Sequence, residues 1–135
     1  MFRFTLFKVF FLGFLCYAHS QPSKNHNQIA FQPTGPSIQT HRLFDDSLSS
    51  SFLIFVRDSV AEHFHRSHTE QVIILEGMAD MLLGDKALKV LPGDIIYIPQ
   101  GTRHSAKVTS QGPLKLISIQ APYFDGTDRV IKTGY

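Results

Sequence analysis

The chain has 135 residues, a formal charge of +2 and a single cysteine. The charge excess lies in the first twenty residues, which hold Arg3 and Lys8 but no acidic side chain, so the rest of the chain is electrically balanced. A balanced chain without a basic run has no electrostatic footprint for nucleic acid, and we expect no such partner. The length accommodates one domain and not two.

The first twenty residues have the pattern of a secretory signal peptide. The two basic residues flank or precede an apolar run over residues 9–18, and Ala18 and Ser20 are small residues suited to cleavage before Gln21. The alternative is a retained membrane anchor, but an uninterrupted span needs ~20 apolar residues and this run is shorter. We therefore expect residues 1–20 to be removed, giving a secreted or periplasmic protein with no stable membrane anchor.

The remaining chain divides into a polar N-terminal part and a strand-rich part. Residues 21–37 are polar and rich in turn formers, which predicts a linker or an N-terminal arm. Residues 38–135 are predicted to form a single domain with a C-terminal tail. Short apolar or alternating runs separated by glycine and proline indicate an all-β sandwich or barrel. These runs cover residues 38–44, 52–57, 60–65, 71–76, 79–83, 87–90, 95–98, 104–109 and 114–120.

A histidine-rich segment is the most informative part of the sequence. Side chains two apart on a strand point to the same face, so His63 and His65 project together while Phe64 points away. Glu70 opens the next apolar strand, and His104 follows a turn that could deliver it to the same interior. Imidazole nitrogens and a carboxylate that converge from neighbouring strands suit a divalent transition metal. The alternative is a set of polar residues on a solvated sheet face.

The spacing of these residues resembles the first cupin motif. His63-x-His65 is followed after four residues by Glu70, and after six more by Gly77. The glycine that opens the motif in the family is absent, since Arg57 stands at that position.

A second segment resembles the second cupin motif. Its pattern is matched by Gly93, then after five residues by Pro99-x-Gly101, and after two more by His104. Val108 stands where the motif ends in asparagine. Fifteen residues separate the two motifs, similar to small single-domain microbial cupins (type-2-like). Because two spaced motifs agree, the resemblance is far more specific than a lone His-x-His pair.

The resemblance implies an all-β, double-stranded β-helix (jelly-roll) barrel with a metal inside one mouth. By position in the motifs, His63, His65, Glu70 and His104 would be the four ligands. Related cupin sites use iron, manganese, nickel or zinc, so the identity of the metal stays open. A cupin that has lost its metal is the alternative.

Three functions compete for such a protein. The favoured one is an exported metal-dependent enzyme, dioxygenase-like, that acts on a small organic molecule, because three imidazoles and one carboxylate leave open positions on the metal. The alternatives are a module that binds a small ligand without turnover and a structural cupin. No separate proton-transfer residue can be named, so the catalytic residues are unknown. A homodimer is possible, as small cupins often pair.

Two further expectations concern residues near the site. His68 lies in the loop between the motif histidines and Glu70, where a surface or pocket-rim position is expected in place of a ligand role. The tail after residue 120 is expected to close over the barrel, with Asp125 or Asp128 pairing Arg129.

Overall fold

The structure is a computed structural model that describes residues 23–131; the expected signal peptide lies outside the described residues. Within 23–131, no helix has the length and apolar character needed to cross a membrane. One short 3₁₀ helix, η1, precedes the strands. The elements are η1 (His26–Gln28), β1 (Ile38–Asp45), β2 (Ser50–Val56), β3 (Ser59–Phe64), β4 (Thr69–Glu76), β5 (Ala79–Leu83), β6 (Lys86–Val90), β7 (Ile95–Ile98), β8 (His104–Val108), β9 (Leu114–Ala121) and β10 (Val130–Ile131).

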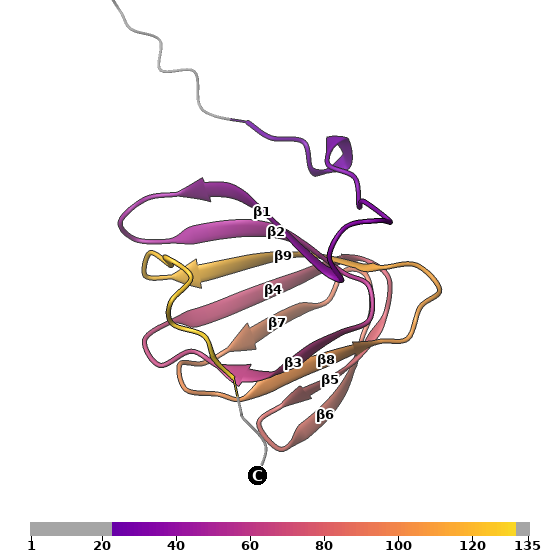
Figure 1. Ribbon diagram of the computed structural model, residues 1–135. Coiled ribbons are helices and arrows are strands. Elements are labelled where there is room, and N and C mark those ends of the chain that lie inside the picture. Colours follow the sequence, from indigo (N-terminus) through magenta and orange to yellow (C-terminus); the bar gives the residue numbers. More distant parts are fainter. Residues whose placement is uncertain (1–22, 132–135) are drawn as a thin grey trace, which may run out of the picture.

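The strands form two five-stranded antiparallel sheets that face each other (Figure 1). One sheet has the order β1-β2-β9-β4-β7, and the other has the order β10-β3-β8-β5-β6. Strands that are consecutive in sequence therefore often lie in different sheets, as in a jelly roll. The all-β, double-stranded β-helix expected from the sequence is confirmed.

Alternating burial explains why the apolar runs became strands. In β4, Glu70, Val72 and Ile74 are buried while the residues between them are more exposed. All nine predicted runs match a strand to within two residues at either end. The short helix η1 and the two-residue strand β10 were not predicted, because both are too short to show a periodic pattern of apolar residues.

Apolar side chains of both sheets face the space between them, except at one end. Burial of such side chains, at about 25 cal/mol per Å² of apolar area, is the main force that holds two sheets together. The apolar core leaves the histidine-bearing end of the barrel polar. The core cluster comprises Val56, Val72, Ile74, Ala79, Met81, Val90, Ile96, Ile98, Leu114 and Leu116.

The described part of the N-terminal arm, residues 23–37, packs against the first sheet. The Gln39 side chain accepts a hydrogen bond from the Gln32 backbone N–H at 2.9 Å and donates to the Gln32 carbonyl at 2.7 Å. Phe31 lies 6.0 Å from Phe55, ring centre to ring centre, on the side of β2 that faces away from the second sheet. The arm therefore covers part of the outer face of its own barrel.

The tail crosses from one sheet to the other. After β9 it leaves the first sheet and runs down to β3, where β10 pairs antiparallel with that strand (Figure 1). In this pairing Val130 lies opposite Phe64, and Ile131 lies opposite His63. The tail thus reaches the strand that carries the first motif histidine.

Candidate metal centre

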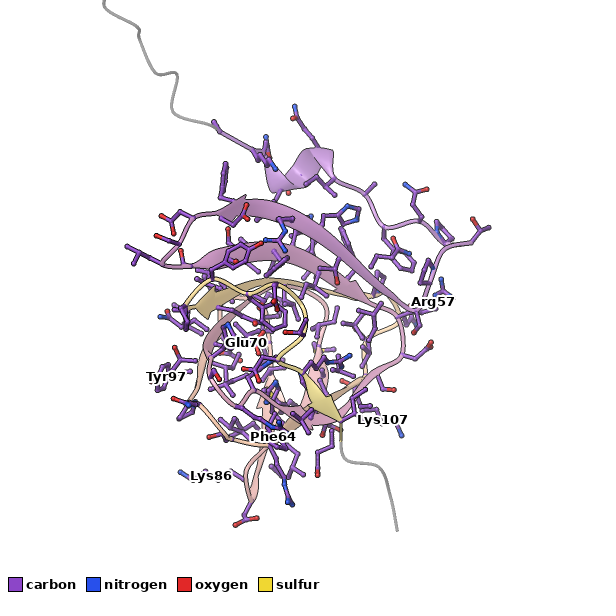
Figure 2. All side chains as sticks on the ribbon, turned by 60° about the vertical axis from the view of Figure 1, so that its left-hand side comes forward. Arg57, Phe64, Glu70, Lys86, Tyr97 and Lys107 are labelled. Atoms are coloured by element: carbon purple, nitrogen blue, oxygen red, sulfur yellow. The ribbon has the colours of Figure 1, made fainter. Side chains whose placement is uncertain are left out.

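Three strands bring the four motif residues to one end of the barrel. His63 lies in β3, His65 directly follows β3, Glu70 lies in β4 and His104 opens β8. Because β3 and β8 pair antiparallel with His63 opposite His104, those two rings come from adjacent positions of one sheet. Glu70 belongs to the opposite sheet, so the group spans the interior of the barrel. Figure 2 shows Glu70 among the side chains between the sheets, whereas Tyr97 projects outward.

The three histidines form a compact, buried cluster. One ring nitrogen from each of His63, His65 and His104 lies within 4.8 Å of the other two, and all three side chains are buried. The rings of His63 and His104 are 4.1 Å apart between their centres. Such proximity is costly for imidazolium ions, because like charges repel strongly in a poorly solvated interior.

The backbone fixes which nitrogen of each ring faces the interior. Nδ1 of His63 lies 2.9 Å from the Ala61 carbonyl, and Nδ1 of His104 lies 3.0 Å from the Thr102 carbonyl. Nδ1 of His65 contacts the carbonyl of Asp128 in the tail. A carbonyl only accepts, so each Nδ1 carries the proton and each Nε2 keeps its lone pair in the neutral ring. This arrangement presents three Nε2 lone pairs to the interior.

Glu70 supplies a carboxylate beside the cluster. Its Oε2 atom lies 3.3 Å from Nε2 of His104 and 3.6 Å from Nε2 of His65, and Oε1 accepts a hydrogen bond from the fully buried Ser118 hydroxyl. Burial raises the pKa of Glu70, but the contacts with His104, His65 and Ser118 outweigh burial and hold the pKa well below its usual range. Glu70 is therefore an anion at neutral pH.

The pKa values of two cluster histidines move in opposite directions. Burial, helped by repulsion from His104, lowers the pKa of His63 to about 4. Burial also lowers the pKa of His65, but Glu70 and the Asp128 carbonyl outweigh it, so the net pKa is raised. In the absence of a metal, His65 is thus the natural partner for the Glu70 negative charge, while His63 remains neutral.

Two buried ring nitrogens of the cluster face the Glu70 carboxylate without a well-formed hydrogen bond. Nε2 of His65 and Nε2 of His104 are buried and lie 3.6 Å and 3.3 Å from Oε2 of Glu70, but neither contact meets hydrogen-bond geometry. A buried polar atom without a partner costs about 1–3 kcal/mol, so such atoms usually mark a functional group or an ion. Three imidazoles and an ionised carboxylate form a donor set that suits a divalent transition metal. The three buried histidines could therefore bind a metal.

A cavity of about 200 Å³ adjoins the cluster. His63, His65, Glu70 and His104 belong to its polar wall, together with Thr40, Ser105, Gln120 and Arg129, and Phe124 of the tail also lines it. The rest of the wall is mainly apolar, as expected from the alternation in the sequence. The apolar lining includes Val56, Val72, Ile74, Met81, Leu114 and Leu116.

His68 was expected at the surface or at the rim of the pocket, and this expectation was wrong. His68 is buried, with Nδ1 2.6 Å from Oδ2 of Asp128 and Nε2 3.0 Å from the Tyr123 carbonyl. Its ring also stacks edge-on against Phe124, at 5.1 Å between centres. It is neither exposed nor part of the cavity wall, because the tail covers it. His68 attaches the tail to the loop beside the cluster.

The expected ion pair of Arg129 was also wrong. Among residues 23–131, Arg129 forms no ion pair with Asp125, Asp128 or any other carboxylate. The Asp128 carboxylate instead accepts hydrogen bonds from the backbone N–H groups of Arg66 and Ser67, in addition to His68. These three hydrogen bonds occupy the Asp128 carboxylate, so it does not turn toward Arg129.

Sequence reasoning missed three residues that shape the site. Ser118 binds Glu70, Phe124 packs 5.4 Å from His65 between ring centres, and Arg129 lines the cavity. Ser118 gave a usable signal, because strand parity places its hydroxyl on the same face as the apolar Leu114 and Leu116. The two tail residues gave none, because their place depends on how the tail crosses the barrel.

The sequence profile of the Cupin domain family matches residues 55–120, a range that contains all four motif residues. A solved structure of an uncharacterized conserved protein with a double-stranded β-helix domain, from Klebsiella pneumoniae, superposes with a TM-score of 0.70 at 16% identity. That superposition covers 84% of this chain and 99% of the other. The chain belongs to the cupin family and is a small cupin-type protein.

Two relatives show the range of proteins to which this sequence is similar. An uncharacterized protein of Aquifex aeolicus is 31% identical over 69% of this chain and 76% of its own length. Quercetin 2,3-dioxygenase of Bacillus subtilis is 31% identical over 48% of this chain, but the match spans only 19% of that enzyme. The second likeness is therefore confined to a part of a much longer protein.

Proposed function

We propose that this protein is a metal-dependent cupin enzyme, dioxygenase-like, that acts on a small organic molecule. The observation that carries the proposal is a cluster of three buried histidines at the wall of a mainly apolar cavity, two of which face an ionised carboxylate with Nε2. The likeness to quercetin 2,3-dioxygenase over the matched segment adds support.

In this proposal His63, His65, Glu70 and His104 are the metal ligands. The metal would be iron, manganese, nickel or zinc, and a redox-active one would supply the chemistry of dioxygen. The chain itself supplies neutral imidazoles held by backbone carbonyls, so little reorganisation is needed on metal binding. Glu70 contributes one negative charge, which offsets part of the charge of a divalent ion.

The cavity limits the substrate to a small molecule. An apolar cavity of roughly 150 Å³ is large enough to hold benzene, so about 200 Å³ accommodates one ring with a small substituent. The apolar wall excludes water from the substrate, and Phe124 covers the cluster from the tail side. Desolvation of this kind strengthens the electrostatic interactions of the reacting groups.

Oxygen uptake tests the proposal directly. The full chain is loaded separately with iron, manganese, nickel and zinc, and oxygen consumption is followed over a panel of catechols, diketones and small acids, with flavonoids as compounds too large for the cavity. The expected result is substrate-dependent uptake with a redox-active metal and none with zinc, lost in His104→Ala. No uptake with any metal, together with saturable binding of a panel compound to the zinc form, would favour a binding module.

We also propose that the protein is exported. The basic residues, the apolar run over 9–18 and the small residues before Gln21 support this placement. N-terminal sequencing of protein purified from its native source should give a start at or near Gln21. A sequence that begins at Met1 would refute export with cleavage.

A further inference from the structure

Arg129 stands out among the residues that line the cavity. It is an exposed arginine of the tail, and its side chain reaches the same cavity wall as the cluster. Within residues 23–131 its guanidinium forms no ion pair or hydrogen bond with a side chain. A guanidinium has five donors and no acceptor, and its planar fork matches a carboxylate.

The neighbours of Arg129 fix its position. On one side, the Asp128 carboxylate binds Arg66 N–H at 2.9 Å and Ser67 N–H at 2.7 Å, and its carbonyl contacts His65. On the other side, Val130 pairs with Phe64 in the β10–β3 ladder. The backbone of Arg129 is thus held on both sides at the cavity, although its side chain has no hydrogen-bond or ion-pair partner among the described residues.

The charge of Arg129 lies at the wall of the cavity that holds the cluster. Glu70 is the single carboxylate among the cavity residues, and it is already engaged by Ser118 and lies against two histidines. The Arg129 charge is therefore available for an anion that enters the cavity.

We propose that Arg129 binds the carboxylate of the substrate, so that the ligands of this cavity are small apolar acids, with one ring or a chain of similar volume. This inference rests on the proposed function, because it assigns a substrate class to the same cavity. The apolar wall takes the hydrocarbon part and Arg129 takes the acid group. A neutral molecule of the same shape would make the apolar contacts without the ion pair and bind more weakly.

The test compares benzoate with benzamide, which has nearly the same shape but no charge. Binding to the full chain is measured by calorimetry in zinc-loaded and in metal-free protein. The variants are Arg129→Gln, Arg129→Lys and, as a matched control, Arg103→Gln, an exposed arginine that does not line the cavity. Zinc content is measured for each variant.

The wild-type chain should bind benzoate about fivefold more tightly than benzamide, since solvent weakens an ion pair with an exposed guanidinium but does not abolish it. Arg129→Gln should remove most of this preference, Arg129→Lys should keep part of it, and Arg103→Gln should not change it. Benzamide affinity and zinc content should stay constant across the series. The lysine variant distinguishes a role of charge from a loss of packing.

Two results would overturn the inference. One is a benzoate preference that survives in Arg129→Gln, which would place the anion on the metal or elsewhere. The other is the absence of benzoate binding to the wild-type chain. Failure of the metal proposal is a separate result, because it appears as a lack of zinc binding, and the metal-free titration then still measures the effect of Arg129.

Discussion

Replacement of Asp128 by alanine should weaken the attachment of the tail to the barrel. The variant removes an acceptor that lies 2.9 Å from Arg66 N, 2.7 Å from Ser67 N and 2.6 Å from Nδ1 of His68. A hydrogen bond to a charged group is worth roughly 1.5–3 kcal/mol, but exposed donors regain water. Arg66 and Ser67 are exposed, whereas His68 is buried. The free energy of unfolding should therefore fall by about 2–4 kcal/mol, mostly from His68.

Thermal unfolding followed by circular dichroism measures this loss. For a domain of this size, ~1 kcal/mol corresponds to ~4 °C, so the Tm should fall by roughly 8–16 °C. Asp125→Ala is the matched control, because within residues 23–131 the Asp125 side chain hydrogen-bonds only to the neighbouring Thr127. Its Tm should stay near the wild-type value. A Tm for Asp128→Ala equal to that of the control would refute the assigned role of Asp128.

The same contact predicts a pH dependence. Desolvation raises the pKa of Asp128, but the bonds from His68, Ser67 and Arg66 outweigh it and lower the pKa to about 2. Because the pKa is depressed on folding, the contribution of Asp128 is present above the ordinary value of 3.8 and is lost as the pH falls toward 2. The stability difference between wild type and Asp128→Ala should shrink over that range. A constant difference would contradict the assignment.

Three further predictions follow from the site and from one turn. Ser118→Ala should lower zinc affinity about tenfold at pH 7, because Glu70 loses a hydrogen bond that orients it; an unchanged titration would refute this role. Zinc affinity should decrease as the pH is lowered from 8 to 5, since His65 has a raised pKa and must release its proton to ligate; a flat profile would argue against imidazole ligands. Gly77→Ala should lower the Tm more than Gly93→Ala. Both residues have positive φ, but a Cβ at Gly77 would lie 2.7 Å from the Pro113 carbonyl oxygen, whereas a Cβ at Gly93 would enter open space. Equal losses of Tm would show that the contact with Pro113 relaxes freely.

Local periodicity made the strands predictable. Val72 and Ile74 alternate with more exposed residues, and a period of two is visible in sequence alone. The motif spacing likewise placed His63, His65 and His104 in one cluster, because strand parity and antiparallel pairing fix the direction of side chains.

The contacts of the tail were not predictable in this way. His68 and Asp128 are sixty residues apart, and nothing in either segment indicates that they meet. The expected pairing of Arg129 with a neighbouring acid rested on proximity in sequence, but the backbone N–H groups of Arg66 and Ser67 satisfy Asp128 first. Short-range charge patterns therefore misplace groups whose partners come from tertiary structure.

The metal content of the purified chain tests the central claim most directly. The full chain and its His104→Ala and His41→Ala variants are loaded with zinc, dialysed and analysed for metal per protein, with circular dichroism as a check on folding. His41 is the control, because it packs edge-on against Phe55 on β2, away from the cluster. The account predicts about one tightly held ion per chain in wild type and in His41→Ala, and loss of most of it in His104→Ala. A folded His104→Ala protein that keeps its ion, or a wild-type chain that keeps none, would contradict the assignment of a metal to this cluster.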